Sequence, residues 1–287
     1  MVQTANPLNK YYRQPSIYIS LPSRGAYYSD QVFKSTDTGE IPVLPMTAKD
    51  EIAFKTPDAM INGQATVDVI RSCCPNLLDP WQLVNYDLDA VLIAIRIATY
   101  GETMDFTAIV PVVNEQVSHT VNLPSLLDQV RQIKIKEDFK TKNGFVFTVK
   151  PLTYKEVTNI QVKTFEQQKQ LVQTNVPGAN VTEEQKTQRF AEAYKALTEL
   201  NFQMLSNAFT KIVTPDGDTV TDKAQIVDFL QNADSVFVNE VQDKMIELRS
   251  QAQIKPLKMK STEEQIKKGA PVSFDVPITF DNSNFFV

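Results

Sequence analysis

Residues 99–123 read TYGETMDFTAIVPVVNEQVSHTVNL, and they alternate larger with more polar side chains along two arms that meet at a polar turn. The alternating positions are Met104, Phe106, Ala108, Val110 and Val112 in the first arm, then Val117, His119, Val121 and Leu123 in the second. Alternation with a period of two is typical of a half-buried strand, and Asn114–Glu115–Gln116 supplies the turn. The stretch therefore predicts an antiparallel hairpin whose tip carries no group that suits catalysis.

Helix signals surround this hairpin. Thr47 and Asp50 resemble a capping box before a short helix, and residues 87–101 form a helical pattern that is apolar on both sides and ends at Gly101. We expect that helix to be enclosed, with an acidic group beside Arg96, because an unpaired buried charge is strongly destabilising. Asn143–Gly144 then marks the turn of a second hairpin. Short helices with antiparallel hairpins indicate an α+β fold.

The last part of the chain is predicted to be mostly helical. Thr153 and Glu156 cap a helix that runs to about Gln173. A second helix of about thirty residues follows; its apolar stripe comprises Phe190, Tyr194, Leu197, Leu200 or Asn201, Met204 and Phe209. It either faces a partner or pairs with the helices over 154–173 and 234–252. Residues 271–287 close this part as a β-hairpin or edge strand.

Length and composition limit the architecture and the partners. The chain of 287 residues favours one large or two modest domains. Its patterns divide it into an extended arm (1–45), an α+β core (46–152), a helical region (153–253) and a C-terminal β-hairpin with tail (254–287). The net charge is −5, without a basic patch, so neither nucleic acid nor membrane is an expected partner. The N-terminus has no apolar leader, and we expect a soluble, non-exported chain.

The residues that carry chemistry in most enzymes are sparse here. None of the eight glycines has the spacing of a phosphate-binding loop. The single histidine, His119, lies in a strand pattern, and the adjacent Cys73 and Cys74 end an apolar helical stripe, which favours packing over a Cys–His pair. A hydrolase built on Asp50, Glu51, Asp87 and Asp89 is the rival interpretation, but their positions at helix starts favour capping. We expect no enzymatic activity, no cofactor, no metal and no small-molecule substrate.

Aromatic side chains at both ends of the chain are candidates for protein interfaces. Residues 6–28 carry five tyrosines in an extended, proline-punctuated segment, and the last residues include two adjacent phenylalanines. Tyrosine and arginine are favoured in interface cores, although the segment can equally pack on its own domain. The candidate residues are Tyr11, Tyr12, Arg13, Tyr18, Tyr27, Tyr28, Phe285 and Phe286. We expect the chain's own N-terminal half to receive the C-terminal strand, and a neighbouring subunit to receive Phe285 and Phe286.

Six segments taken together resemble one family. They are NPLNKYYRQPSIYISLPSRG (6–25), IPVLPMTAKDEI (41–52), KTPDAMINGQA (55–65), IRSCCPNLLDPWQL (70–83), DLDAVLIAIRIATYGETM (87–104) and FDNSNFFV (280–287). In this order they are similar to the T-even-type baseplate hub subunit family of contractile-tailed bacteriophages. The resemblance covers roughly residues 6–165 well, and the C-terminal tail more loosely.

The resemblance implies a structural role in the virion, within a tail baseplate that is assembled in the host cytoplasm. The partners it implies are other phage baseplate or tail proteins, with further copies of the same chain. An assembly chaperone that leaves before the tail matures is the alternative. Relatives often carry a C-P-x-C zinc knuckle just after the A-T-Y-G turn, where this chain has Val110 and Val113. The resemblance therefore implies a hairpin retained for packing, without zinc.

Overall fold

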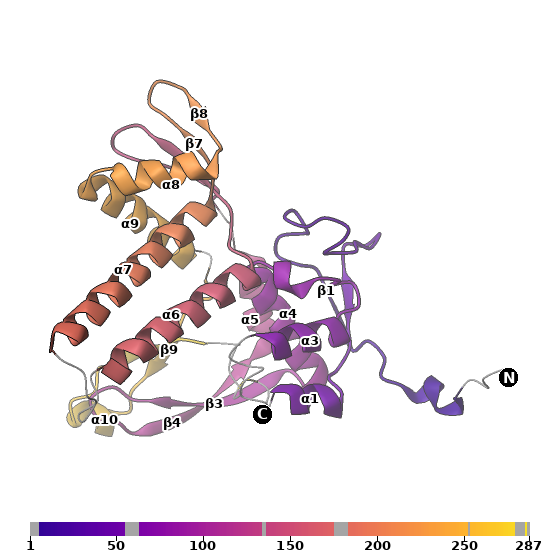
Figure 1. The fold of residues 1–287 in the computed structure, drawn as a ribbon. Helices are drawn as coiled ribbons and strands as arrows, with labels where there is room; N and C mark the ends of the chain where they lie inside the picture. The colour runs from indigo at the N-terminus through magenta and orange to yellow at the C-terminus, as the bar shows by residue number, and fades with distance from the viewer. Residues whose placement is uncertain are drawn as a thin grey trace. The chain divides into compact units, whose positions relative to one another are not determined.

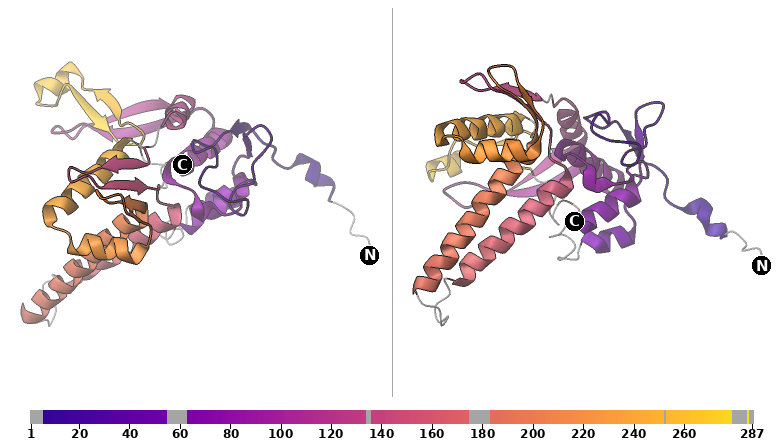
Figure 2. Two further views of the ribbon diagram at one scale, coloured as in Figure 1. Left: turned by 90° about the horizontal axis from the view of Figure 1, so that it is seen from above. Right: turned by 45° about the horizontal axis from the view of Figure 1, so that its top comes forward.

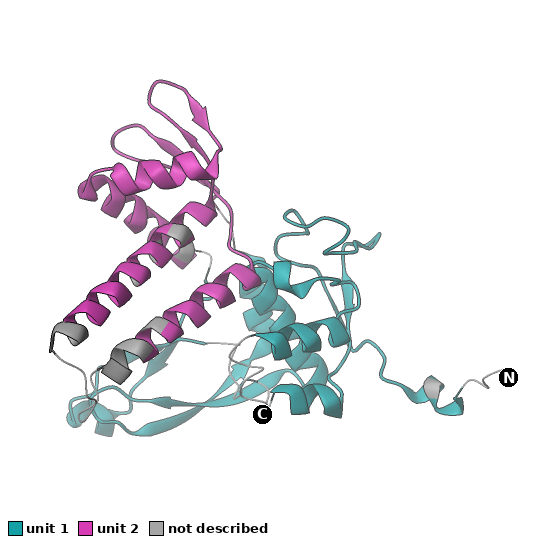
Figure 3. Cartoon of the chain, viewed as in Figure 1, with its two compact units in different colours: residues 1–133, 253–287 teal, residues 134–252 magenta. Residues whose placement is uncertain are grey.

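The computed structural model describes residues 6–54, 63–133, 136–174, 183–251, 253–278 and 285. The chain forms two compact units, with residues 1–133 and 253–287 in unit 1 and residues 134–252 in unit 2 (Figure 3). Both units combine helices with antiparallel strands, which confirms the predicted α+β class. Unit 1 thus joins the predicted arm and most of the predicted core to the C-terminal hairpin. Unit 2 joins the end of that core to the helical region.

The centre of unit 1 is the helix α4 (Asn85–Tyr100), which is apolar on every side. Its residues from 90 to 96 are all buried, as the two apolar faces in the sequence predict. The helices α3 (Gln64–Cys73) and α5 (Leu123–Arg131) pack against it. Gly101 ends α4 with a φ of 95°, a conformation that glycine adopts without steric strain.

Short elements from the first part of the chain complete this side of unit 1. The antiparallel strands β1 (Ile17–Ile19) and β2 (Ile41–Val43) form a two-stranded sheet, and β1 packs against α4. The helix α1 (Ala48–Phe54) begins at the predicted capping box, where the Thr47 hydroxyl accepts from the Asp50 amide at 3.2 Å. The short 3-10 helices are η1 (Pro7–Tyr11) and η2 (Pro80–Gln82). Figure 1 shows η1 on an arm that extends away from the rest of unit 1.

The hairpin predicted from residues 99–123 is present as β3 (Thr103–Ile109) and β4 (Gln116–Asn122). Its register runs from Thr103 opposite Asn122 to Ile109 opposite Gln116. The tip is closed by backbone bonds, with the Val110 amide donating to the Glu115 carbonyl at 2.8 Å. Val110, at the first position of the replaced knuckle, is fully buried. The tip is therefore a packing site within the described part of the chain.

The C-terminal hairpin packs on this tip. The strands β9 (Leu257–Lys260) and β10 (Ser273–Val276) pair antiparallel and enclose the short helix α10 (Glu263–Lys267). Their shared apolar cluster comprises Ala108, Val110, Met259, Ala270 and Phe274. Two polar contacts add to it, because Glu115 accepts from Lys268 at 2.6 Å and from Gln265 at 3.1 Å. The chain's own N-terminal half thus receives the C-terminal strand, as expected.

The C-terminal strand is shorter than its sequence pattern suggests. Residues 272–280 alternate without interruption, but β10 covers only Ser273–Val276. Val272 is 67 % exposed, so the predicted single apolar face does not extend to it, whereas Phe274 is 8 % exposed. Phe280 lies outside the described residues. The alternation identifies the strand, and contact with β9 decides its length.

Unit 2 contains a four-stranded antiparallel sheet with the strand order β5-β6-β7-β8. The strands are β5 (Asp138–Lys140), β6 (Val146–Val149), β7 (Phe209–Val213) and β8 (Thr219–Val220). The helices are α6 (Tyr154–Thr174), α7 (Glu183–Ala208), α8 (Lys223–Asn232) and α9 (Ser235–Gln251). Figures 1 and 2 show α6 and α7 side by side. The long helix therefore pairs with α6, one of the two arrangements left open by the sequence.

Two details of the helical region differ from the sequence prediction. Phe209 begins β7 instead of ending the apolar stripe of α7, because it packs against Phe147 on the sheet with ring centroids 4.9 Å apart. Phe190 and Tyr194, in the first half of that stripe, are exposed. The described residues of this half therefore bury little of the predicted apolar face. No described helix in either unit is long and apolar enough to cross a membrane.

The packing of the C-terminal hairpin yields a prediction about stability. Phe274→Ala should lower the free energy of unfolding by about 3–5 kcal/mol, because it leaves a cavity in the cluster that joins the two hairpins. Val272→Ala, two residues away on an exposed side chain, should change it by less than about 0.5 kcal/mol. Urea unfolding of both variants checks this. Similar losses from the two substitutions would contradict the packing.

Candidate functional site

The base of the N-terminal arm is fixed by Arg13. One guanidinium nitrogen lies 3.3 Å from the Asp50 carboxylate, and the other donates to the carbonyl and the hydroxyl of Ser72, both at 2.7 Å. Asp50 is buried in the first turn of α1 and also accepts from the Thr47 amide at 2.8 Å. Buried charges are stable only when paired and hydrogen-bonded, and both groups meet that condition here. Arg13 is therefore a structural anchor for the arm.

The residues before this anchor are exposed. Tyr11 is 73 % exposed and Tyr12 is 60 % exposed, and Leu8 on the same arm is also exposed. The Lys10 ammonium lies 4.9 Å from the centre of the Tyr11 ring. Large apolar side chains grouped on so short a segment tend to mark an interaction site. Tyr11 and Tyr12 are thus placed as an interface requires.

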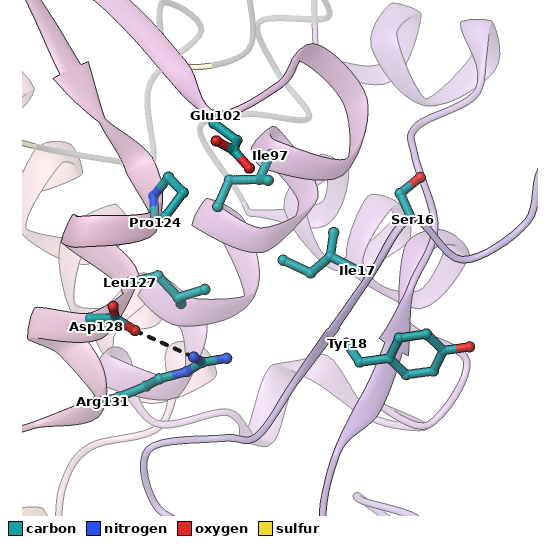
Figure 4. A pocket seen from close by; sticks show the side chains of 9 residues that line it. All are labelled: Ser16, Ile17, Tyr18, Ile97, Glu102, Pro124, Leu127, Asp128 and Arg131. Carbon is teal, nitrogen blue, oxygen red and sulfur yellow. Dashed lines mark hydrogen bonds and ion pairs between the residues drawn. The ribbon is translucent and has the colours of Figure 1, made fainter.

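Tyr18 lies on β1, beside an open cavity of about 410 Å³ in unit 1 (Figure 4). We call this cavity the β1 groove; its lining residues are Ser16, Ile17, Tyr18, Ile97, Glu102, Pro124, Leu127, Asp128 and Arg131. Ile17 points into it from the strand, opposite the helices α4 and α5. Asp128 and Arg131 form an ion pair at 3.4 Å on its rim. The groove therefore has apolar walls and charged edges.

Tyr28 is half-buried and hydrogen-bonded within unit 1, and its assignment as an interface residue stays a prediction. Its hydroxyl donates to the Asp87 carboxylate at 2.6 Å and accepts from the Val84 amide at 3.0 Å. Ser23 donates to the same carboxylate from its amide, at 2.9 Å, and from its hydroxyl. Burial raises the pKa of Tyr28 above its usual value, and the neighbouring carboxylate raises it further. Tyr27, the adjacent candidate, is half-buried.

The C-terminal candidate Phe285 also lies inside unit 1. It is 2 % exposed, and its carbonyl accepts from the Arg96 guanidinium at 2.8 Å. The expectation that a neighbouring subunit receives Phe285 is therefore corrected, because the chain's own α4 holds it. The expected acidic group beside Arg96 is replaced by this carbonyl and by the Tyr100 ring, 4.4 Å away. Phe286 lies outside the described residues.

The cysteines and the histidine that were weighed for catalysis or metal binding lie in different surroundings. Cys73 and Cys74 are fully buried, and burial raises the pKa of Cys73 to about 11 and that of Cys74 well above its usual value. Both thiols thus stay protonated at neutral pH, which makes them poor nucleophiles. His119 stands beside Phe106 on the hairpin with an edge-on ring contact. Within the described ranges, no three His, Cys, Asp or Glu residues group as a metal site.

Two features of this site have no signal in the sequence. The anchor joins residues 37 positions apart, and although a capping box marks Asp50, nothing in the pattern pairs it with Arg13. The β1 groove combines residues from β1, α4 and α5, which meet only in the folded chain. The sequence separates Tyr28, which is hydrogen-bonded to Asp87, from the exposed tyrosines only if that partner is assigned in advance.

The two roles of the tyrosines can be separated by removing one hydroxyl at a time. Tyr28→Phe should lower the free energy of unfolding by about 1–3 kcal/mol, since it leaves the buried Asp87 carboxylate without one donor. Tyr18→Phe removes an exposed hydroxyl and should leave stability unchanged. Calorimetric melting of the two variants makes the comparison. If the Tyr28→Phe variant melted at the same temperature as the wild type, the hydrogen bonds of the Tyr28 hydroxyl would not contribute to stability.

Comparison with known proteins identifies a family. The family model described as T4 bacteriophage base plate protein matches residues 28–274, which include most of unit 1 and the whole of unit 2. No curated protein and no solved structure matches the chain. The family match begins after the arm and after Tyr18, so these lie outside it. Because the match extends over well more than half of its residues, the chain belongs to the T4 bacteriophage base plate protein family.

Proposed function

We propose that this protein is a structural component of the tail baseplate of a contractile-tailed bacteriophage, in the baseplate hub, and that it acts through protein–protein interfaces. The observation that carries the proposal is the family match over residues 28–274. Membership in this family indicates a phage baseplate protein in the virion tail, whose partners are other baseplate or tail proteins. The position in the hub and the assembly in the host cytoplasm belong to the proposal, with support from the sequence resemblance.

The described surfaces support an interface role. Leu8, Tyr11 and Tyr12 project from unit 1 on an anchored arm, and exposed aromatic groups of this kind are favoured in interface cores. In unit 2, the exposed large side chains on α6 and α7 are Phe165, Phe190 and Tyr194. Both units thus offer apolar contact area to partners, while Cys73, Cys74, Asp50 and Asp87 are buried within the fold.

The proposal also holds that the protein remains in the mature particle and has no enzymatic activity. Mass spectrometry of purified phage particles tests the first point directly. We expect the protein at a stoichiometry comparable to that of other baseplate components. Its presence in assembly intermediates, together with its absence from purified particles, would indicate an assembly chaperone and would overturn the structural role.

The arm provides a specific prediction. Deletion of residues 1–12 leaves the Arg13 anchor in place, so the truncated protein should fold and melt as the full chain does. It should nevertheless enter particles less than about one-tenth as well, because the apolar contact area of an interface core is lost. Complementation of a phage that lacks the gene, followed by quantification of the protein in particles, measures this.

A matched control is Arg13→Met in the full chain, which removes the anchor but keeps the exposed tyrosines. It should lower stability, because Asp50 is left buried without its cation. The truncation and the substitution thus affect different measurements. Normal incorporation of the truncated protein would contradict a docking role for the arm.

A further inference from the structure

The β1 groove has the form of a receptor for an extended segment. Among the described strands, β1 pairs only with β2, so its other edge is not paired with a described strand, and Ser16, Ile17 and Tyr18 line the groove. An unpaired strand edge presents backbone N–H and C=O groups that can bind an incoming extended chain. The apolar walls of the groove are Ile17, Ile97, Pro124 and Leu127. A cavity of about 410 Å³ lies within the range of known binding sites, about 300–1,000 Å³.

The charges of the groove favour a basic occupant. Glu102 and Asp128 contribute two negative charges, and Arg131 contributes one positive charge that is paired with Asp128 at 3.4 Å. Glu102 forms no ion pair with any of the described residues. The groove therefore carries one net negative charge that is exposed at its rim. A lysine or arginine in the incoming segment would complement it.

The N-terminal arm, taken here as residues 6–12, has the matching chemistry. Its apolar side chains Leu8, Tyr11 and Tyr12 are exposed, and Lys10 is its one charged residue. One positive charge on the arm thus faces one net negative charge in the groove. Its exposed rings also supply the apolar surface that the walls of the groove would cover.

The groove and the arm of one copy are not placed to meet each other. Arg13 is held under α1 and α3, and only Gln14 and Pro15 separate it from Ser16 at the start of the groove. The arm would have to reverse its direction at once in order to run past β1. Figures 1 and 2 show it extending away from β1 instead. Its own groove is therefore left open to another chain.

From the match in charge and apolar surface, we propose that the β1 groove receives the N-terminal arm of a second copy of this chain. Residues 6–12 of one copy lie along the outer edge of β1 of the other, with Leu8 and a tyrosine against the apolar walls and Lys10 beside Glu102. Because every copy carries both parts, two copies can exchange arms reciprocally, which doubles the contact without any further surface. The proposal names the partner of the arm and so rests on the proposed interface function.

Charge reversal on the purified full chain tests this pairing. Analytical ultracentrifugation should show concentration-dependent self-association of the wild type, and loss of it after deletion of residues 1–12. Lys10→Glu and Glu102→Lys should each raise the dissociation constant about fivefold or more, because each places like charges together. The double variant should return to within about twofold of the wild type, since the pair is restored with opposite polarity.

Two matched controls reverse charges elsewhere on unit 1. Lys34→Glu and Glu40→Lys change exposed residues outside the groove and the arm, and should leave the dissociation constant unchanged. The charge-dependent part of the association should also weaken as salt increases.

Three outcomes would overturn the proposal. The first is a wild-type chain that stays monomeric up to about 100 μM. The second is a pair of single charge reversals that leave the dissociation constant unchanged. The third is a double variant whose loss of affinity equals the losses of the two single variants combined. Self-association is measured on purified protein, whereas the baseplate role is measured in particles. A monomeric chain that still needs its arm for incorporation would thus refute arm exchange alone and point to a different baseplate protein as the partner.

Discussion

The burial of α4 is the constraint on which unit 1 depends. An enclosed helix has no solvent-facing side for polar groups, so each charged residue on it needs a partner supplied by the surrounding chain. Asp87, in its first turn, accepts from Ser23 and Tyr28, and Arg96, near its end, donates to the carbonyl of Phe285. The two charges thereby attach segments that lie 59 or more positions away in sequence. The apolar surface of α4 drives the packing, and its charges select which segments surround it.

Hydrogen bonding within the chain also distinguishes Tyr28 from the exposed tyrosines of the arm. Tyr28 donates to Asp87, and Arg13 donates to Asp50 and Ser72. Tyr28 and Arg13 are therefore part of the internal hydrogen-bond network. Tyr11 and Tyr12 stand just beyond the anchor and remain exposed. A rigid base with an exposed end limits the conformational entropy that the arm loses when it binds a partner. The anchor is thus part of the fold, and under the proposed docking of the arm it would also reduce that loss of entropy.

The tip of the β3–β4 hairpin is held by packing and by backbone hydrogen bonds. Valines at 110 and 113 cannot bind a metal, but the tip is still closed by backbone hydrogen bonds and covered by the C-terminal hairpin. Burial of Val110 and Phe274 stabilises a contact between segments from opposite ends of the chain. Hydrophobic packing and the ion pair of Glu115 with Lys268 hold the tip together in the described structure.

The sequence by itself determined the local elements. Period-two alternation specified β3, β4 and β10, apolar residues on both sides specified an enclosed α4, and capping residues specified the start of α1. These patterns suffice because strand alternation, helical periodicity and capping are set by neighbours within a few residues. The helical stripe that ends at Cys73 and Cys74 also predicted their burial, which the structure confirms.

Only the tertiary structure decided which candidate residues are exposed and where the strands of unit 2 lie. Phe209 leaves the helical pattern because a sheet that begins at residue 138 receives it, and Phe190 and Tyr194 stay exposed although the stripe predicts their burial. Arg13, Tyr28 and Phe285 are hydrogen-bonded to acceptors or donors far away in sequence. The identity of a single residue does not indicate which distant residue it will contact. Pairing across the fold depends on how whole elements pack, so it is settled only once the chain has folded.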